Sequence, residues 1–206
     1  MKTDAVAFGV AGIAFGLIAG WVIGTQQANL RTPNSPPPPA ASTAPAAPAD
    51  TRAAVLDEAQ VTALKAVAER DAANPKPRAD LANLYFDAER YDDAIRWYQE
   101  ALKLNPKDVN ISTDLGVSYY YTNQPDKAVE QLGQSLKLDP KHAKTLLNLG
   151  IVKAFAKQDL DGATAAWQRV IELAPDSPEG QAAKRALDSL ASAHRGIGGG
   201  AQKPGA

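Results

Sequence analysis

The sequence predicts an all-α solenoid of three helix-turn-helix repeats, with a capping helix on each side and a transmembrane helix in front. Pro106, Pro140 and Pro175 close successive units at a spacing of about 34 residues. Hydrophobic residues make up 45% of the chain but aromatic residues only 6%, because alanine supplies much of the total. That balance favours helices packed closely through small residues, and no stretch shows the alternation typical of a strand.

Composition excludes several classes of function. The chain has 206 residues, with Lys+Arg 22 against Asp+Glu 23, so it lacks the basic excess of a protein that neutralises nucleic-acid phosphates. It has no cysteine, which removes disulfides, thiol catalysis and cysteine-based metal sites. We therefore expect no nucleic-acid partner and no cofactor.

The N-terminal region is expected to contain a membrane anchor. After a short flank at residues 1–4, residues 5–24 carry no charge and end near Trp21, an interfacial residue type. As a helix this stretch would be roughly 30 Å long, which matches the hydrocarbon core of a bilayer. A cleaved signal peptide is the alternative, but the apolar stretch exceeds the usual 7–15 residues or so and no A-x-A site follows it.

A stripe of glycines runs along this predicted helix. Gly12, Gly16, Gly20 and Gly24 recur every fourth residue and so share one face. Small residues in this register allow close helix packing in lipid, which favours membrane-helix self-association and a homo-oligomer. The other interpretation is that glycine is simply common in membrane helices.

Two segments are expected to be disordered. Residues 25–51 are rich in proline and alanine and predict an extended linker that holds the next domain away from the membrane. Residues 195–206 form a glycine-rich tail. Lys2 before the anchor and Arg31 after it leave orientation weakly specified, but the linker is typical of periplasmic proteins. We expect a single-pass protein of the bacterial inner membrane with a periplasmic repeat domain.

The repeats occupy residues 75–108, 109–142 and 143–177. In each unit three pattern positions fall on the first helix: a large residue, the small residue directly after it, and a third residue. Three more fall on the second helix, and in the first two units these are small, large and small in turn. These are, in order, Leu81, Ala82, Tyr85, Ala94, Tyr98 and Ala101; Leu115, Gly116, Tyr119, Ala128, Leu132 and Ser135; and Leu149, Gly150, Lys153, Ala163, Trp167 and Val170. This pattern resembles the tetratricopeptide-repeat (TPR) family, in which L-G-x-x-Y, A-x-x-x-F and P recur in each unit.

The third unit departs from the pattern twice. One extra residue between Lys157 and Gly162 predicts a longer turn, and Lys153 stands where an aromatic residue is usual, which predicts a thinner core. Apolar residues at helical spacing predict a capping helix within residues 52–74 and another over residues 178–194.

The resemblance implies a concave groove lined by the first helices, which holds a partner's peptide or helix. By that resemblance the partner-binding groove contains residues from each unit in turn: Asn83 and Phe86; Val117, Tyr120 and Tyr121; Lys144, Asn148, Ile151 and Phe155. Some of these, especially Phe86 and Phe155, could instead be core residues of their own helix pair.

TPR proteins that grip chaperone tails use a two-carboxylate clamp. In this chain only Asn83 and Lys144 match the residues that such a clamp requires, while Ala79, Asp114 and Asn148 replace the others. Because Asp114 would repel a terminal carboxylate, we expect an apolar or helical ligand instead.

No catalytic constellation is evident. His142 and His194 are isolated and predict surface side chains, not a metal site or a triad. Asp92, Asp93, Asp159 and Asp161 begin second helices, where carboxylates stabilise the helix N-terminus, and paired general acids are a poor alternative. We expect a protein that is not an enzyme.

The predicted function is a membrane-anchored adaptor for envelope complex assembly. The anchor, the linker and the segment from Trp167 to Pro178 resemble the TPR subunits of bacterial cytochrome c maturation and haem-lyase complexes. That resemblance implies capture of an apocytochrome's C-terminal helix. The alternative is an oligomeric scaffold for a secretion, pilus or outer-envelope machine.

Overall fold

A computed structural model describes residues 55–198, with side chains to residue 192. The predicted membrane helix at residues 5–24, its glycines Gly12, Gly16, Gly20 and Gly24, the linker at 25–51 and residues 199–206 lie outside the described residues. Among the helices that are described, none is both long enough and apolar enough to cross a membrane.

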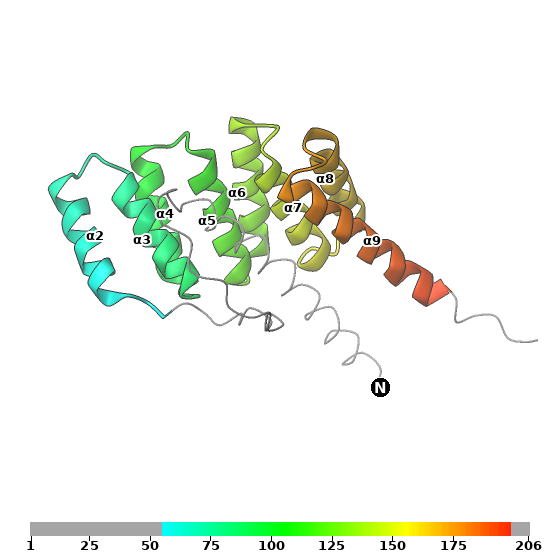
Figure 1. The fold of residues 1–206 in the computed structure, drawn as a ribbon, viewed down its shortest axis with the longest axis horizontal. Coiled ribbons are helices and arrows are strands. Elements are labelled where there is room, and N and C mark those ends of the chain that lie inside the picture. The colour runs from blue at the N-terminus through cyan, green and yellow to red at the C-terminus, as the bar shows by residue number, and fades with distance from the viewer. Residues whose placement is uncertain (1–54, 199–206) are drawn as a thin grey trace, which may run out of the picture. The chain divides into compact units, whose positions relative to one another are not determined.

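The described residues form eight helices and no strand (Figure 1). The three predicted units are the pairs α3 and α4, α5 and α6, and α7 and α8, with α2 before them and α9 after them. Their bounds are α2 Glu58–Arg70, α3 Lys76–Asp87, α4 Tyr91–Leu104, α5 Val109–Tyr121, α6 Pro125–Leu138, α7 Ala143–Phe155, α8 Leu160–Leu173 and α9 Pro178–Gly198. Helix α9 therefore continues past residue 195, where the glycine-rich tail was predicted to begin.

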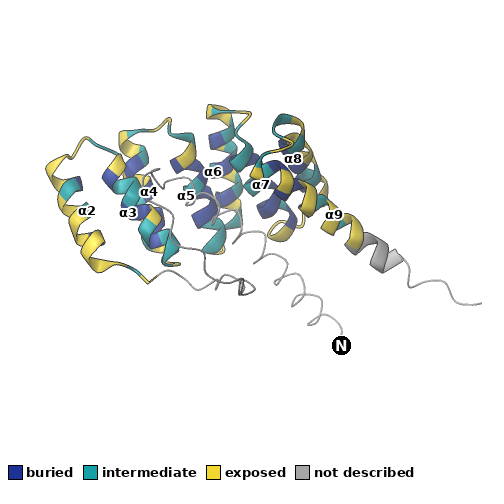
Figure 2. Ribbon diagram, in the orientation of Figure 1, coloured by how far each residue is buried: buried dark blue, intermediate teal, exposed yellow. Residues whose placement is uncertain are grey.

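The helices stack in the order of the chain. Each one packs against the next, and two pairs of helices that are one helix apart also touch, α5 with α7 and α7 with α9. Buried residues accordingly line the faces between neighbouring helices, while α2 and α9 keep one exposed side (Figure 2). This is the all-α solenoid that the sequence predicted, because each unit buries its apolar face only against its neighbours.

Most of the predicted core residues are fully buried. Leu81, Ala82, Tyr98, Leu132 and Trp167 are among the least exposed side chains of the described part. Tyr119, Leu149 and Lys153 are only half-buried. The ammonium group of Lys153 turns outward to Asp159, 3.1 Å from its Oδ2.

The small residues at the helix crossings have a steric role. A Cβ on Gly116 would come 2.8 Å from Cγ of Leu132, and a Cβ on Gly150 would overlap the indole of Trp167. The two helices of the second unit and of the third thus approach too closely for a larger residue at these points, whereas the first unit has Ala82 in the equivalent place.

The turns inside the three units share one backbone feature, a residue in the left-handed conformation. Glu89, Asn123 and Gln158 have φ values of 57°, 57° and 55°, the left-handed conformation that commonly ends a helix. The third turn spans residues 156–159, one residue longer than 88–90 and 122–124, as the sequence predicted. Asp159 then caps α8 by accepting a hydrogen bond from the Gly162 N–H, which together with Lys153 lowers the pKa of its carboxyl group.

Candidate functional site

The predicted groove residues lie on the first helices of the three units. Asn83 and Phe86 are on α3, Val117, Tyr120 and Tyr121 on α5, and Lys144, Asn148, Ile151 and Phe155 on α7. The contact between α5 and α7 brings the second and third sets together. Aromatic side chains connect α3 to α5.

Four aromatic rings form a continuous cluster across the first two units. Phe86 meets Tyr121 edge to face, with ring centroids 5.8 Å apart, and Tyr120 lies 5.6 Å from Tyr121. Tyr91 stacks on Tyr121 at 4.6 Å, with only 9° between the ring planes, and lies 5.2 Å from Phe86. We call Phe86, Tyr91, Tyr120 and Tyr121 the aromatic cluster.

Tyr91 was not among the predicted site residues. It is the first residue of α4, a second helix, whereas the predicted groove uses first helices only. The left-handed turn at Glu89 reverses the chain and returns Tyr91 beside the end of α3. In the sequence, Tyr91 can be recognised as an aromatic residue that directly follows the turn after the helix of Phe86.

The tyrosines of the cluster remain protonated. Burial is the main cause that raises the pKa of Tyr121 to about 12, and the nearby Glu89 carboxylate adds to it. Burial also raises the pKa values of Tyr91 and Tyr120, and Tyr121 adds to both. The cluster is therefore uncharged, and its phenols can donate hydrogen bonds at neutral pH.

Asn83 is oriented by the core beneath it. The hydroxyl of Tyr98 donates a hydrogen bond to Asn83 Oδ1 over 2.7 Å. Tyr98 is buried, and burial, with smaller contributions from Asp114 and Asp87, raises its pKa well above the ordinary value. Because the amide oxygen is engaged, Asn83 presents its amide nitrogen as a donor on the exposed side.

An ion pair joins the second unit to the third. Lys144 Nζ lies 2.5 Å from Asp114 Oδ1, and these side chains are only 16% and 24% exposed. Asn148 donates its amide N–H to the Lys144 backbone carbonyl over 2.8 Å. The cation and the amide that were predicted to orient a ligand are thus held within the protein's own structure.

The aliphatic residues predicted for the groove lie at its base. Val117 and Ile151 are 9% and 4% exposed, so they support α5 and α7 more than they project. Phe155, by contrast, is 41% exposed. Phe86 is half-buried and packs against the core of the first unit.

His142 is part of a polar chain that also crosses from the second unit to the third. Its Nδ1 lies 2.7 Å from Thr145 Oγ1, and its Nε2 lies 3.1 Å from Asn110 Oδ1. Thr145 in turn lies 2.6 Å from the hydroxyl of Thr113, and both threonines are fully buried. His142 is thus half-buried at a junction between units, where the α5–α7 contact supplies hydrogen-bond partners that are distant in sequence.

Nothing in this region is arranged for metal chemistry. Within the part of the chain that the structure describes, no group of three His, Cys, Asp or Glu side chains could hold a metal ion. The buried polar side-chain atoms there all have hydrogen-bond partners. What this face can supply is aromatic surface with a few oriented polar groups.

Comparisons with known proteins agree with the fold. A family model described as "TPR repeat" matches residues 82–123, and one described as "Tetratricopeptide repeat" matches residues 113–178. No curated protein sequence is significantly similar to the chain.

Several solved structures are similar. The TPR domain of Sgt2 from Aspergillus fumigatus is 25% identical with a TM-score of 0.55, over 64% of this chain and 86% of that one. The first TPR of Spaghetti (RPAP3), bound to HSP90 peptide SRMEEVD, is 22% identical with a TM-score of 0.51, over 67% and 95%. MamA is 18% identical with a TM-score of 0.54, over 64% and 89%.

Proposed function

Because the chain carries tetratricopeptide repeats, matched over residues 82–178, we propose that it is a non-enzymatic adaptor that binds an apolar or helical segment of a partner protein. The ligand lies along the first helices α3, α5 and α7. TPR arrays are interaction modules, and their stacked first helices offer one continuous surface to a peptide.

The aromatic cluster is the observation that carries this proposal. Phe86, Tyr91, Tyr120 and Tyr121 are all half-buried, so each has a packed side and an accessible side. Large rings held in place by neighbours lose little conformational entropy on binding and contribute apolar contact area. Their neutral phenols add hydrogen bonds at the edge of that surface.

Electrostatics disfavours an acidic C-terminal tail in this groove. The Spaghetti domain is described as bound to a peptide that ends in Asp. Here Lys144, one of the two residues that match a carboxylate clamp, is paired with Asp114. A terminal carboxylate would have to displace Asp114 and remain beside it, which is unfavourable at such short range.

Site-specific photocrosslinking in cells tests the groove. A benzoyl-phenylalanine at Tyr120 is expected to capture a partner segment, whereas the same group at Lys65 is not. Lys65 is exposed on α2 and lies outside the predicted groove. Mass spectrometry of the crosslinked peptide identifies the segment.

The outcome depends on both the position and the captured sequence. An amphipathic or apolar segment captured from Tyr120, and lost in a Tyr121→Ala background, supports the groove. Equal capture from Lys65 and Tyr120, or capture of lipid alone, contradicts it. Circular dichroism of each variant confirms that the helices remain folded.

We also propose that residues 5–24 anchor the adaptor in the bacterial inner membrane with the repeats in the periplasm. The uncharged length of this segment and the proline-rich spacer after it support the proposal. Alkaline phosphatase fused after Ala49 is expected to be active in intact cells. An inactive fusion would place the repeats in the cytoplasm.

Cytochrome c maturation is the pathway that the sequence resemblance favours. Under that proposal, the segment captured at Tyr120 is the C-terminal helix of an apocytochrome.

The alternative, an oligomeric envelope scaffold, rests on the register of Gly12, Gly16, Gly20 and Gly24. Replacing Gly16 by Ile is expected to break crosslinked oligomers under the scaffold proposal and to leave partner capture intact under the adaptor proposal.

A further inference from the structure

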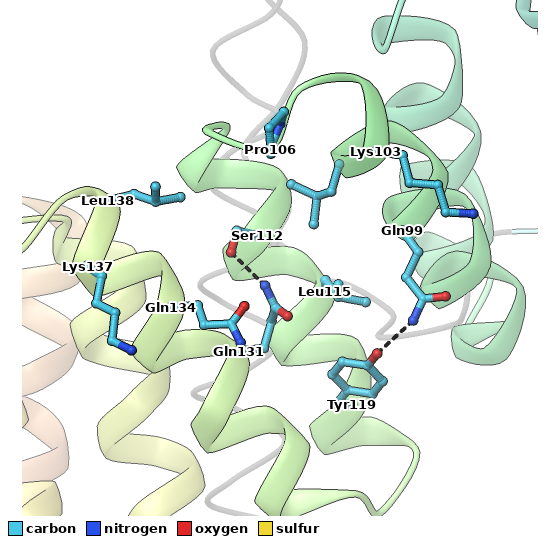
Figure 3. Close-up of a pocket in the computed structure, with 11 residues that line it drawn as sticks. Gln99, Lys103, Pro106, Ser112, Leu115, Tyr119, Gln131, Gln134, Lys137 and Leu138 are labelled. Atoms are coloured by element: carbon cyan, nitrogen blue, oxygen red, sulfur yellow. Dashed lines mark hydrogen bonds between the residues drawn. The ribbon is translucent and has the colours of Figure 1, made fainter.

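A cavity lies on the opposite side of α5 from the aromatic cluster. It has a volume of about 610 Å³, within the range of ligand sites, and is bounded by α4, α5 and α6 (Figure 3). Its lining residues are Gln99, Leu102, Lys103, Pro106, Ser112, Leu115, Tyr119, Gln131, Gln134, Lys137 and Leu138. We call it the second-helix cavity, because α4 and α6 form its walls.

Helix geometry separates this cavity from the predicted groove. On α5 the cavity is lined by Ser112, Leu115 and Tyr119, whereas the groove prediction uses Val117, Tyr120 and Tyr121. At about 100° per residue, the two sets point in directions roughly 160° apart. A ligand in one site therefore does not contact the other.

The cavity has a positive lining. Lys103 and Lys137 stand on opposite walls at equivalent places in successive units, and no Asp or Glu is among the lining residues. Lys103 also pairs with Glu100, but that pair is exposed and within one helix, so it contributes little and can be exchanged. In the third unit Glu172 takes the place of these lysines, so the positive lining is particular to the first two units.

The polar lining is held in position by hydrogen bonds. Gln99 donates to the Tyr119 hydroxyl over 2.8 Å, and Gln131 donates to Ser112 Oγ over 2.7 Å (Figure 3). Ser112 is buried and also accepts a hydrogen bond from Ser135. Each of these bonds uses one N–H of a glutamine amide, so the second N–H and the carbonyl group can serve a ligand.

We propose that the second-helix cavity binds an extended, acidic segment of a partner protein. Oriented amides match the backbone N–H and C=O groups of an extended chain, which a helical ligand would already have satisfied internally. Leu102, Leu115 and Leu138 provide apolar contacts, and Leu138 is 43% exposed, so it is accessible. Lys103 and Lys137 supply the charge complementarity for carboxylates.

The test uses a fluorescein-labelled peptide, Glu-Leu-Glu-Leu-Glu-amide, and the full-length chain. In an extended peptide the alternation places leucines on one side and carboxylates on the other. We expect saturable binding by fluorescence anisotropy, weakened by added salt. The matched peptide Gln-Leu-Gln-Leu-Gln-amide is expected to bind at least about tenfold more weakly, a loss of about 1.4 kcal/mol.

Substitutions locate the bound peptide. Combining Lys103→Glu with Lys137→Glu is expected to raise the Kd at least about tenfold, since it reverses both cavity charges. The control Lys107→Glu makes the same charge change at an exposed position outside the cavity and is expected to leave the Kd unchanged. Tyr121→Ala is also expected to have no effect, which distinguishes this site from the proposed groove.

Four results would overturn the proposal. They are no binding of the acidic peptide, equal binding of the glutamine peptide, an equal loss in Lys107→Glu, or a loss in Tyr121→Ala. All of the substituted lysines are exposed, so the fold should be retained, and circular dichroism verifies it. Failure here leaves the photocrosslinking test of the groove unaffected, because that test measures capture from Tyr120, which does not line the cavity.

Discussion

At the scale of single residues, close contacts decide which positions tolerate change. Gly150 and Gly133 are both helical glycines, on α7 and α6. A Cβ at Gly150 would overlap the buried indole of Trp167, whereas a Cβ at Gly133 would meet nothing within 4 Å. The same chemical change should therefore have opposite effects at the two positions.

We expect Gly150→Ala to destabilise the protein by about 1–3 kcal/mol, because Trp167 is too confined to move aside. Gly133→Ala is expected to stabilise it by about 0.5–1 kcal/mol, through the higher helix propensity of alanine. Urea unfolding followed by circular dichroism measures both. Equal effects of the two substitutions would show that the indole has room to shift.

His142 makes stability depend on pH. Burial lowers its pKa below the ordinary 6.5, and the nearby Lys144 lowers it further, whereas Asp139, Asp114 and Glu179 oppose the shift. The unfolded chain therefore binds the proton more tightly than the folded one. This contribution is fully present above the unfolded pKa and is lost as the pH falls through the folded pKa.

We expect the free energy of unfolding to decline as the pH is lowered below 6.5, before most carboxylates titrate. His142→Gln should flatten that decline, and His194→Gln should leave it unchanged. Urea unfolding at a series of pH values measures the slope. An unchanged slope in His142→Gln would assign the effect to other groups.

At the scale of helices and turns, the left-handed residues set where each first helix ends. At Glu89, Asn123 and Gln158 a residue with a Cβ occupies a conformation that glycine adopts without strain. The backbone bonds that close the first two turns support it: Arg90 N–H to the Tyr85 carbonyl, and Gln124 N–H to the Tyr119 carbonyl, both 2.8 Å. The turns thus carry a small strain that the surrounding structure maintains.

Gln158→Gly is expected to raise the free energy of unfolding by about 1 kcal/mol, because it relieves this strain at an exposed position. Asn123→Gly should gain less, since asparagine tolerates the conformation better than most residues. Thermal unfolding of both variants makes the comparison. A loss of stability in Gln158→Gly would mean that unfolded-chain entropy outweighs the strain.

At the scale of the whole stack of described helices, stability should follow a nearest-neighbour rule. Each helix contacts the next, and α7 also contacts α5 and α9, so the two ends are linked only through the units between them. Val61 on α2 and Val170 on α8 are both buried and lie at opposite ends of this stack. Leu132 and Val152 instead belong to one core cluster.

We expect Val61→Ala and Val170→Ala to add, with the double variant within about 0.5 kcal/mol of the sum of the singles. Leu132→Ala and Val152→Ala should deviate from additivity by more than that, since their cavities merge. Double-mutant cycles in urea measure both pairs. Strong coupling between Val61 and Val170 would reveal cooperativity beyond nearest neighbours.

The sequence by itself determined the architecture. Periodic prolines, small residues such as Gly116 and Gly150, and large partners such as Leu132 and Trp167 specify helix ends and helix crossings, which are local properties. The longer third turn followed from one extra residue. Repetition made these signals readable, because each unit restates the same pattern.

Only the tertiary structure decided which side chains meet between units. Tyr91 joins the aromatic cluster, His142 reaches Asn110, and Lys144 pairs with Asp114 because the stacking of helices sets distances that sequence spacing does not. The second-helix cavity likewise arises where α4 and α6 stand apart over α5. Core positions can be predicted from the sequence of a single repeat, whereas surface sites depend on how neighbouring repeats pack against one another.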